Sequence, residues 1–177
     1  MNNIRLRALE PEDLDMLYRL ENDRDMWDVG ITNTPYSRYA LHNFIDTATG
    51  DIYTDRQVRL MVTKDSEASS EQTLGMADLF NFDPAHRRAE VGIVIAKAYR
   101  QCGYARQALN QLHSYAHRTL HLHQVYAIVS TGNLPAIRLF RSLEYVESAH
   151  LCQWLFNGNS YADAVVMQKI LDSPKNC

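Results

Sequence analysis

Residues 91–95, Val-Gly-Ile-Val-Ile, and residues 100–106, Arg-Gln-Cys-Gly-Tyr-Ala-Arg, decide the fold of this chain. The first stretch is almost wholly apolar, which is typical of a central strand covered on both faces. Beyond the second stretch, apolar residues recur at helical spacing as far as Leu120, and residues 125–129 form another apolar strand. A strand, a helix and a strand in this order predict a βαβ unit with parallel strands and a right-handed crossover.

The chain on either side of this unit adds further strands and helices. Alternating or apolar runs predict strands at residues 4–8, 58–62, 74–82, 145–156 and 161–170. Helices are expected from residue 11, after Asn133, and in one or two short pieces within residues 26–50, around a turn at Thr34-Pro35. The sequence therefore predicts a single α+β domain over residues 1–177. Its sheet is expected to be twisted and mostly antiparallel, with the parallel crossover at its centre and helices on its flanks.

Length and composition indicate one ordinary folded domain. The chain has 177 residues, of which 46% are hydrophobic and 22% charged, and such a chain can form one core. No apolar run approaches the roughly 18 residues of a membrane helix, and the N-terminus is too charged for a signal peptide. Three cysteines, Cys102, Cys152 and Cys177, indicate reduced thiols. We therefore expect a cytoplasmic protein without a membrane partner.

Charge is distributed unevenly along the chain. Residues 1–83 carry 8 Lys and Arg against 16 Asp and Glu, a net of −8, whereas residues 84–177 carry 10 against 5, a net of +5. This asymmetry suits a protein that holds a cationic molecule beside an anionic one, although solubility alone explains it equally well. The basic residues are scattered among apolar ones, so nucleic-acid binding is not expected.

The turn between the central strand and the long helix is the first candidate binding site. Gly103 lies just before the helix and is flanked by Arg100 and Arg106. Backbone N–H groups can approach an anion closely at such a turn, and the helix dipole favours negative charge. The turn therefore suits a pyrophosphate, although it lacks the third glycine of a dinucleotide motif and the Gly-Lys-Ser/Thr ending of a triphosphate loop.

Several motifs together resemble the GNAT acetyltransferase superfamily, whose signature Arg/Gln-x-x-Gly-x-Gly/Ala is matched by Arg100, Gly103 and Ala105. The resemblance extends over nearly the whole chain, through residues 4–7, 11–14 and 86–90 and the motif Asn133-x-x-Ala136-Ile137. Within the superfamily, the chain is most similar to the branch of spermidine acetyltransferases and ribosomal-protein N-terminal acetyltransferases.

The resemblance implies acetyl-CoA as the donor of an acetyl group that a primary amine attacks directly. Backbone N–H groups of residues 100–106 would bind the pyrophosphate, and the pantetheine arm would run along residues 93–95 and past Asn133. The residues expected to bind the donor are Ile93, Val94, Ile95, Arg100, Gln101, Cys102, Gly103, Tyr104, Ala105, Arg106, Asn133, Ala136 and Phe140. The acceptor would be a polyamine such as spermidine, or the N-terminal amine of a protein or peptide.

An alkylamine with a pKa near that of lysine, about 10.4, must lose a proton before it can attack. Glu90, at the mouth of the buried strand, is the expected general base, because partial burial would raise its pKa toward the operating pH. An ordinary ion pair with Arg87 or Arg88 is the alternative role, and it would lower that pKa instead.

Two residues depart from the pattern of the family. Phe140 stands where the family has a tyrosine that protonates the departing thiolate, so that Tyr126, Tyr145 or a water would have to substitute, with Tyr145 as the second candidate catalytic residue. Glu144 stands where the helix normally ends in glycine. These departures leave open a second function, a module that binds acyl-CoA with little or no turnover.

No metal site is expected from the sequence. His113, His117 and His121 follow one another at a helical spacing of four residues, but no carboxylate accompanies them in that segment. We therefore expect them to be surface histidines of the long helix. Exposed sheet edges near the C-terminus predict a homodimer or a larger homo-oligomer.

Overall fold

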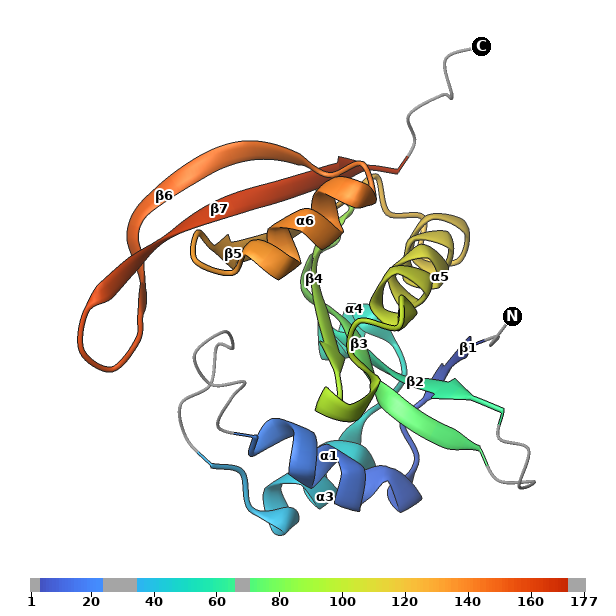
Figure 1. Cartoon of the computed structure of the whole chain (residues 1–177). Helices are drawn as coiled ribbons and strands as arrows, with labels where there is room; N and C mark the ends of the chain where they lie inside the picture. Colours follow the sequence, from blue (N-terminus) through green and yellow to red (C-terminus); the bar gives the residue numbers. More distant parts are fainter. Residues whose placement is uncertain (1–3, 24–34, 66–70, 172–177) are drawn as a thin grey trace.

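The chain folds around one seven-stranded sheet with helices on both faces (Figure 1). The structure is a computed structural model, and it describes residues 4–23, 35–65 and 71–171. In chain order the elements are β1 (Ile4–Ala8), the 3₁₀ turn η1 (Pro11–Asp13), α1 (Leu14–Glu21), α3 (Arg38–Thr47), α4 (Ile52–Asp55), β2 (Val58–Lys64), β3 (Gln72–Asp83), β4 (Arg88–Ile95), the 3₁₀ turn η2 (Lys97–Tyr99), α5 (Tyr104–Arg118), β5 (Gln124–Ser130), α6 (Leu134–Ser142), β6 (Val146–Phe156) and β7 (Tyr161–Ile170). Within the described ranges, no helix is both long and apolar enough to span a membrane.

The strand order in the sheet is β1-β2-β3-β4-β5-β7-β6. Each neighbouring pair is antiparallel except β4 and β5, and α5 makes the crossover between these two strands. The apolar stretch at residues 91–95 lies centrally because β4 has a strand on each side, with Val91 and Ile95 buried in the core that α5 covers. The predicted α+β fold, with one parallel crossover inside a mostly antiparallel sheet, is confirmed.

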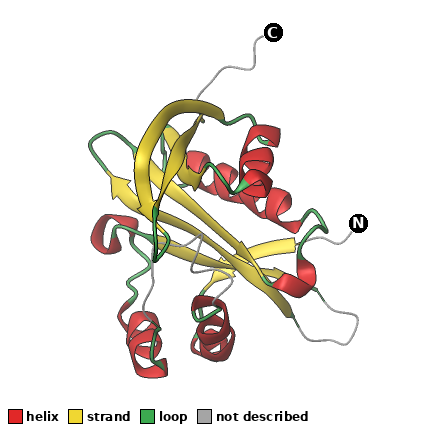
Figure 2. Ribbon diagram, turned by 60° about the vertical axis from the view of Figure 1, so that its left-hand side comes forward, coloured by secondary structure: helices red, strands yellow, loops and turns green. Residues whose placement is uncertain are grey.

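Two clusters of buried side chains lie on opposite faces of the sheet. The larger cluster joins the strands to the apolar faces of α5 and α6 and includes Leu109 and Val62. The smaller cluster lies under α1 and α3 and includes Leu17 and Met61. Because neighbouring residues of a strand point to opposite faces, Met61 and Val62 of β2 belong to different clusters. Figure 2 shows the two groups of helices on either side of the strands.

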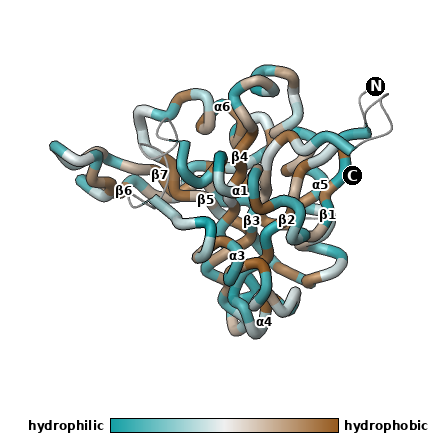
Figure 3. Tube along the Cα trace, turned by 90° about the horizontal axis from the view of Figure 1, so that it is seen from below, coloured by the Kyte–Doolittle hydropathy of each residue, from teal (hydrophilic) through white to brown (hydrophobic). Residues whose placement is uncertain are grey.

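The hairpin of β6 and β7 extends away from the body of the molecule in Figure 1. Figure 3 shows hydrophobic stretches along the central strands β3 and β4, and both hydrophilic and hydrophobic stretches along β6 and β7. Five large apolar side chains of this hairpin are exposed, namely Val146, Trp154, Phe156, Tyr161 and Ile170. The hairpin therefore offers an apolar surface as well as an open strand edge.

The segment expected to hold one or two short helices contains one, α3, in its described part. Ser37 begins this helix, because its hydroxyl accepts a hydrogen bond from Ala40 N over 3.0 Å. Pro35 belongs to no helix or strand, and Thr34 lies outside the described residues, so the expected turn at Thr34-Pro35 falls partly outside them.

Candidate active site

The two parallel strands separate beyond their first residue pairs. β4 pairs with β5 at Arg88↔Gln124, Ala89↔Val125 and Glu90↔Tyr126. Further along, β4 stays paired with β3 as far as Ile95, and β5 stays paired with β7 as far as Ser130. The β5-facing edge of residues 91–95 therefore lies outside the ladder, where an extended ligand can add main-chain hydrogen bonds as another strand would.

The turn before α5 presents backbone N–H groups. Gln101 and Gly103 have positive φ angles of 62° and 78°, and left-handed residues of this kind turn successive N–H groups toward one point. The first bond of the helix runs from Gln107 N to Gly103 O, so the N–H groups of the first turn have no acceptor within the helix. Together with the positive end of the helix dipole, they suit a pyrophosphate.

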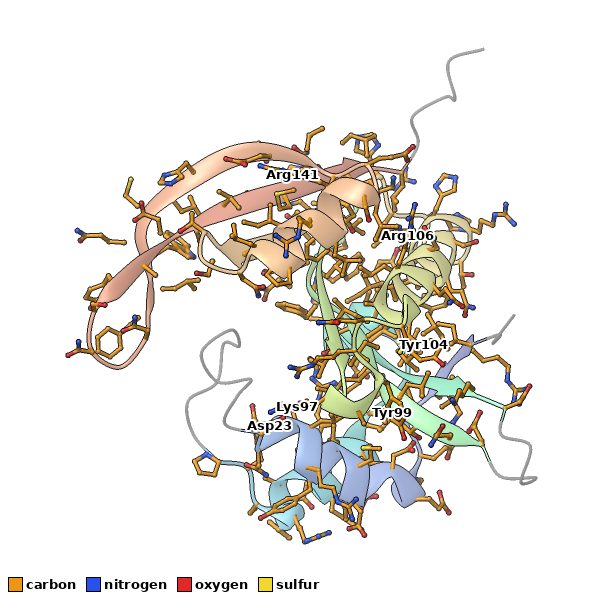
Figure 4. All side chains as sticks on the ribbon, in the orientation of Figure 1. Asp23, Lys97, Tyr99, Tyr104, Arg106 and Arg141 are labelled. Atoms are coloured by element: carbon orange, nitrogen blue, oxygen red, sulfur yellow. The ribbon has the colours of Figure 1, made fainter. Side chains whose placement is uncertain are left out.

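Side chains attach this turn to the sheet and to the core. Arg100 Nε donates to Ile95 O at the end of β4 over 3.0 Å, and Tyr104 is buried in the larger cluster. Figure 4 shows Lys97 and Tyr99 on the turn after β4, and Tyr104 and Arg106 at the start of α5. The predicted donor-binding residues 93–95 and 100–106 thus form one stretch, from the free edge of β4 to the start of α5.

Glu90 lies where the parallel strands begin to separate. The residue is only 6% exposed, Asn81 Nδ2 donates to its Oε2 over 2.9 Å, and the backbone N–H of Ile128 on β5 also bonds to it. Burial raises the pKa of Glu90 and outweighs these two hydrogen bonds, which lower it. A carboxyl group with a raised pKa is suited to accept a proton close to neutral pH.

The two arginines that precede Glu90 have other partners. Arg87 Nε donates to His121 O over 2.7 Å, and Arg88 Nη2 donates to Asp83 Oδ2 over 3.2 Å. An ion pair with either arginine would lower the pKa of Glu90, whereas that pKa is raised. Within the described part of the chain, these contacts favour the general base over the ion pair as the role of Glu90.

The face of the sheet beside Glu90 carries further acidic groups. Glu90 and Gly92 face the same side of β4, and a Cβ on Gly92 would lie 3.5 Å from Asp78 Cβ. Arg59 donates to both carboxylate oxygens of Asp78 over 2.9 Å, and it also pairs with Glu21 at the end of α1. Two carboxylates thus bind the guanidinium of Arg59 on the face of the sheet where Glu90 also lies, and acidic groups gathered in this way suit a cationic ligand.

Tyr126 lies opposite Glu90 on β5. Burial raises the pKa of its hydroxyl, and the charge of Glu90 raises that pKa further. A phenol with a raised pKa keeps its proton at neutral pH, so Tyr126 can act as a proton donor beside the separating strands.

The residues expected on α6 lie next to the other face of the sheet. Asn133 Oδ1 accepts a hydrogen bond from Ala136 N over 3.2 Å and so caps the helix. Phe140 packs edge-on against Tyr145, with ring centroids 4.9 Å apart, and both residues are buried in the larger cluster. Asn133 thus caps α6, the helix past which the donor is expected to run. Phe140 lies on the side of α6 that packs into the core.

Tyr145 contacts a histidine that the sequence analysis placed on the helix surface. Its hydroxyl lies 2.7 Å from His113 Nε2 of α5, the residue is 3% exposed, and burial strongly raises the pKa of the hydroxyl. The structure therefore brings Tyr145 together with His113 in the core, and it does not bring Tyr145 to Glu90. The expectation of an exposed histidine is wrong for His113, because its position on α5 belongs to the apolar face.

Three polar residues of the site were not predicted from the sequence. Asn81, Asp78 and Arg59 are brought to the region of Glu90 by the antiparallel pairing of β2, β3 and β4. A signal was available at Asp78, because an acid inside an otherwise apolar strand is rarely buried without a partner. Its partner Arg59 depends on strand register, which the sequence alone does not reveal.

Comparisons with known proteins find relatives along most of the chain. A family model described as "Acetyltransferase (GNAT) domain" matches residues 3–146. The spermidine N(1)-acetyltransferase of Vibrio cholerae serotype O1 is 28% identical over 162 residues, which span 92% of this chain and 90% of that protein. The protein of the same name from Escherichia coli K12 is 28% identical over 166 residues, or 94% of this chain and 85% of that protein.

Solved structures share the fold as well. The spermidine N-acetyltransferase of Vibrio cholerae in complex with CoA and spermine superposes with a TM-score of 0.84 and 28% identity, over 95% of each chain. A structure described as the dodecameric form of the Vibrio cholerae enzyme superposes with a TM-score of 0.78 and 28% identity, over 95% of this chain and 94% of the other. The similarity therefore covers almost the whole of both chains.

Proposed function

Since this chain belongs to the acetyltransferase (GNAT) domain family, we propose that it moves the acetyl group of acetyl-CoA to a primary amine of a polyamine such as spermidine. One observation carries the proposal: β4 and β5 separate beside a turn lined with N–H groups, and a buried carboxyl group lies where they part. The spermidine acetyltransferases among the relatives support the polyamine as acceptor.

Main-chain groups would hold the donor. The N–H groups of residues 100–106 would bind its pyrophosphate, and the free edge of residues 93–95 would pair with the pantetheine amides as a strand pairs. Arg100 would keep the turn in place through its bond to Ile95 O. Asn133 and Ala136, at the start of α6, and the ring of Phe140 would line the donor from the side of α6.

The donor supplies a thioester whose carbonyl oxygen gains negative charge as the amine attacks. A backbone N–H on the free edge of β4 would stabilise this charge, because a fixed dipole in a water-poor site costs no reorganisation during the reaction. No side chain is needed for this step.

Glu90 would take the proton that the amine must lose. Its raised pKa brings it closer to the neutral range in which a general base acts best. The thiolate would leave without help or with a proton from Tyr126 or a water. Tyr145, the other candidate from the sequence, lies in the core, where its hydroxyl is hydrogen-bonded to His113. Because that hydroxyl already has a partner away from Glu90, Tyr126 is favoured as the proton donor.

Charge on the face of α1 and α3 favours a polyamine over a peptide N-terminus. Glu21, Asp78 and Glu90 place acidic groups on this face, and a polyamine carries several positive charges along an aliphatic chain. The aromatic ring of Phe44, beside Arg59 at 5.3 Å from its guanidinium carbon, adds an apolar surface for methylene groups.

The assembly and location extend this proposal. The dodecameric relative and the exposed apolar side chains of β6 and β7 support a homo-oligomer, the homodimer being its smallest form. The absence of a membrane-spanning helix in the described residues is compatible with action in the cytoplasm.

Release of free CoA thiol from acetyl-CoA tests the proposal across four conditions: spermidine, spermine, a peptide with a free N-terminus, and no amine. We expect thiol release that depends on the amine and a kcat/KM for spermidine at least tenfold above that for the peptide. Higher activity toward the peptide would contradict the choice of acceptor. Saturable binding of CoA without amine-dependent release would instead establish the acyl-CoA-binding module.

A further inference from the structure

We infer that His150 and Cys152 of β6 and Asp163 of β7 form a binding site for a divalent transition metal ion of the zinc type. One donor atom of each residue lies within 4.8 Å of the donor atoms of the other two. His150 Nδ1 is 3.7 Å from Cys152 Sγ, and His150 Nε2 is 3.5 Å from Asp163 Oδ2. A single ion would bind through one of the two ring nitrogens of His150, and the three donor atoms, one from each residue, lie within 4.8 Å of one another.

Strand geometry explains why these residues meet. His150 and Cys152 are two residues apart on β6, so they point to one face. His150 pairs with Val165 of β7, and Asp163 is two residues from Val165 and points to that same face. The three side chains therefore converge from two neighbouring strands, although the sequence separates His150 from Asp163 by the whole turn of the hairpin.

A bulge in β6 orients the carboxylate. The pairing of β6 with β7 is irregular between Leu151 and Leu155, and Gln153 within this irregularity has a φ of 50°. The N–H of Gln153 donates to Asp163 Oδ1 over 2.7 Å. This hydrogen bond fixes Oδ1 of Asp163, and the other oxygen, Oδ2, faces His150. Partners that fix a ligand in this way are typical of metal sites.

The spacing of the donor atoms is close to what zinc requires. Zinc bonds of about 2.3 Å to sulfur and about 2.0–2.2 Å to nitrogen and oxygen place tetrahedral donors roughly 3.3–3.7 Å apart. In the structure the three donor atoms lie up to 4.8 Å apart, so the largest separation exceeds the tetrahedral range by about 1 Å. Because the side chains of His150 and Asp163 are 48% and 40% exposed, small rotations can close the difference without moving the backbone.

The donor set selects the kind of metal. A thiolate, an imidazole and a carboxylate are ligands of zinc and its neighbours, whereas Mg²⁺ and Ca²⁺ prefer oxygen alone. Three protein ligands leave one tetrahedral position to water or to an added ligand. The exposure of Cys152 and His150 lets the ion enter from solvent.

Cobalt(II) titration of the full-length protein tests this site, because a thiolate bound to cobalt produces an intense charge-transfer absorption. The background carries Cys102→Ser and Cys177→Ser, so that Cys152 is the remaining thiol. We expect one cobalt ion per chain with this absorption, displacement of the cobalt by Zn²⁺, and protection of Cys152 from alkylation by the bound Zn²⁺.

Three variants and one control identify the ligands. Cys152→Ser should abolish the thiolate absorption, and His150→Gln and Asp163→Asn should each weaken binding by more than the roughly 10- to 100-fold cost of losing an outer-sphere partner. His86→Gln, at another exposed histidine, should leave binding unchanged. Circular dichroism checks that each variant is folded. If Asp163→Asn does not fold, the result for the site rests on the His150 and Cys152 variants. Absence of the absorption in the background, or binding that His150→Gln does not weaken, would overturn the site.

Discussion

Glu90 is held between two opposing influences on its charge. Its burial disfavours the carboxylate, whereas the amide of Asn81 and the N–H of Ile128 favour it. Burial prevails, and the pKa of Glu90 rises. The two hydrogen bonds still keep the carboxyl in place between the separating strands, so that the same contacts position the group and tune its proton affinity.

Replacement of Glu90 by glutamine tests its role as general base. Glu90→Gln keeps the volume and removes the proton acceptor, so we expect kcat to fall by roughly 10²-fold or more, with unchanged affinity for CoA. The measurement is steady-state release of CoA thiol together with CoA binding by calorimetry. Glu147→Gln, at an exposed ion pair of β6, is the matched control. A kcat for Glu90→Gln equal to that of the control would show that Glu90 is not the general base and has a structural role instead.

The same residue predicts how activity depends on pH. The base acts when it is ionised, so kcat/KM should decline as pH falls through the pKa of Glu90. Because burial raises that pKa above its ordinary value of 4.5, the decline should begin at a higher pH than an exposed glutamate would produce. A pH profile measured with spermidine checks this, and a rate that stays constant down to the ordinary range of a glutamate would contradict it.

At the scale of elements, α6 shows how the chain ends a helix without glycine. Glu144 takes a φ of 67°, and Glu144 N and Tyr145 N donate to Arg141 O and Phe140 O. This is the pattern of hydrogen bonds with which a glycine usually ends a helix. Lys169 Nζ donates to Leu143 O and to the carboxylate of Glu144, and these bonds help to offset the cost of the left-handed residue.

The close approach of β3 and β4 fixes the end of the strand that would hold the donor. Gly75 lies opposite Ile95, and a Cβ at Gly75 would come within 2.0 Å of Val94 O. No side chain can be accommodated there unless β4 moves. The position of the free edge of β4 therefore depends on a glycine in the neighbouring strand.

Replacement of Gly75 by alanine should displace the end of β4. We expect Gly75→Ala to lower the free energy of unfolding by about 1–3 kcal/mol, the usual cost of overpacking, and to weaken CoA binding. Urea denaturation and calorimetry measure the two effects. In Gly132→Ala, the new methyl group would meet only Ser130 Oγ at 3.7 Å, so its stability should change by no more than about 0.5 kcal/mol. Equal stabilities of the two variants would refute the steric argument.

At the scale of the whole molecule, one buried pair joins the crossover helix to the start of the C-terminal hairpin. His113 of α5 and Tyr145, just before β6, share a hydrogen bond inside the larger cluster. Burial, together with the smaller effect of the charge of Lys169, lowers the pKa of His113 to about 4. The imidazole is therefore neutral in the folded protein across the physiological range.

This neutral histidine predicts a loss of stability in acid. The unfolded chain binds a proton at His113 near pH 6.5, whereas the folded chain does so near pH 4, so stability rises with pH between these values. The contribution is complete above about pH 6.5 and is lost toward pH 4, by up to about 3 kcal/mol. Urea denaturation of wild type and His113→Gln at pH 7 and pH 5 measures it. The variant should lose less stability on acidification.

Tyr145→Phe is the matched control for this prediction. It removes the hydrogen bond but keeps the imidazole buried, so it should be less stable at both pH values and keep the wild-type dependence on pH. An equal pH dependence in wild type and His113→Gln would show that other groups cause the acid sensitivity.

The sequence by itself determined the order of the elements, the parallel crossover and the turn at residues 100–106. These features are local: apolar residues at a period of 2 or 3.6 define strands and helices, and a glycine before a helix defines the turn. Glu90 was also predictable, because a carboxyl group at the start of an apolar strand must be buried or paired.

Only the tertiary structure decided which groups surround Glu90, where β4 and β5 separate, and what His113 and Cys152 contact. Asn81 and Ile128 reach Glu90 from different strands, and the thiol, imidazole and carboxylate of the β6–β7 hairpin meet across a bulge. Such contacts depend on register and on irregular pairing, and a shift of one residue would turn each side chain to the opposite face. Neither register nor irregularity leaves a periodic trace in the sequence, since both follow from how the whole sheet packs against its helices.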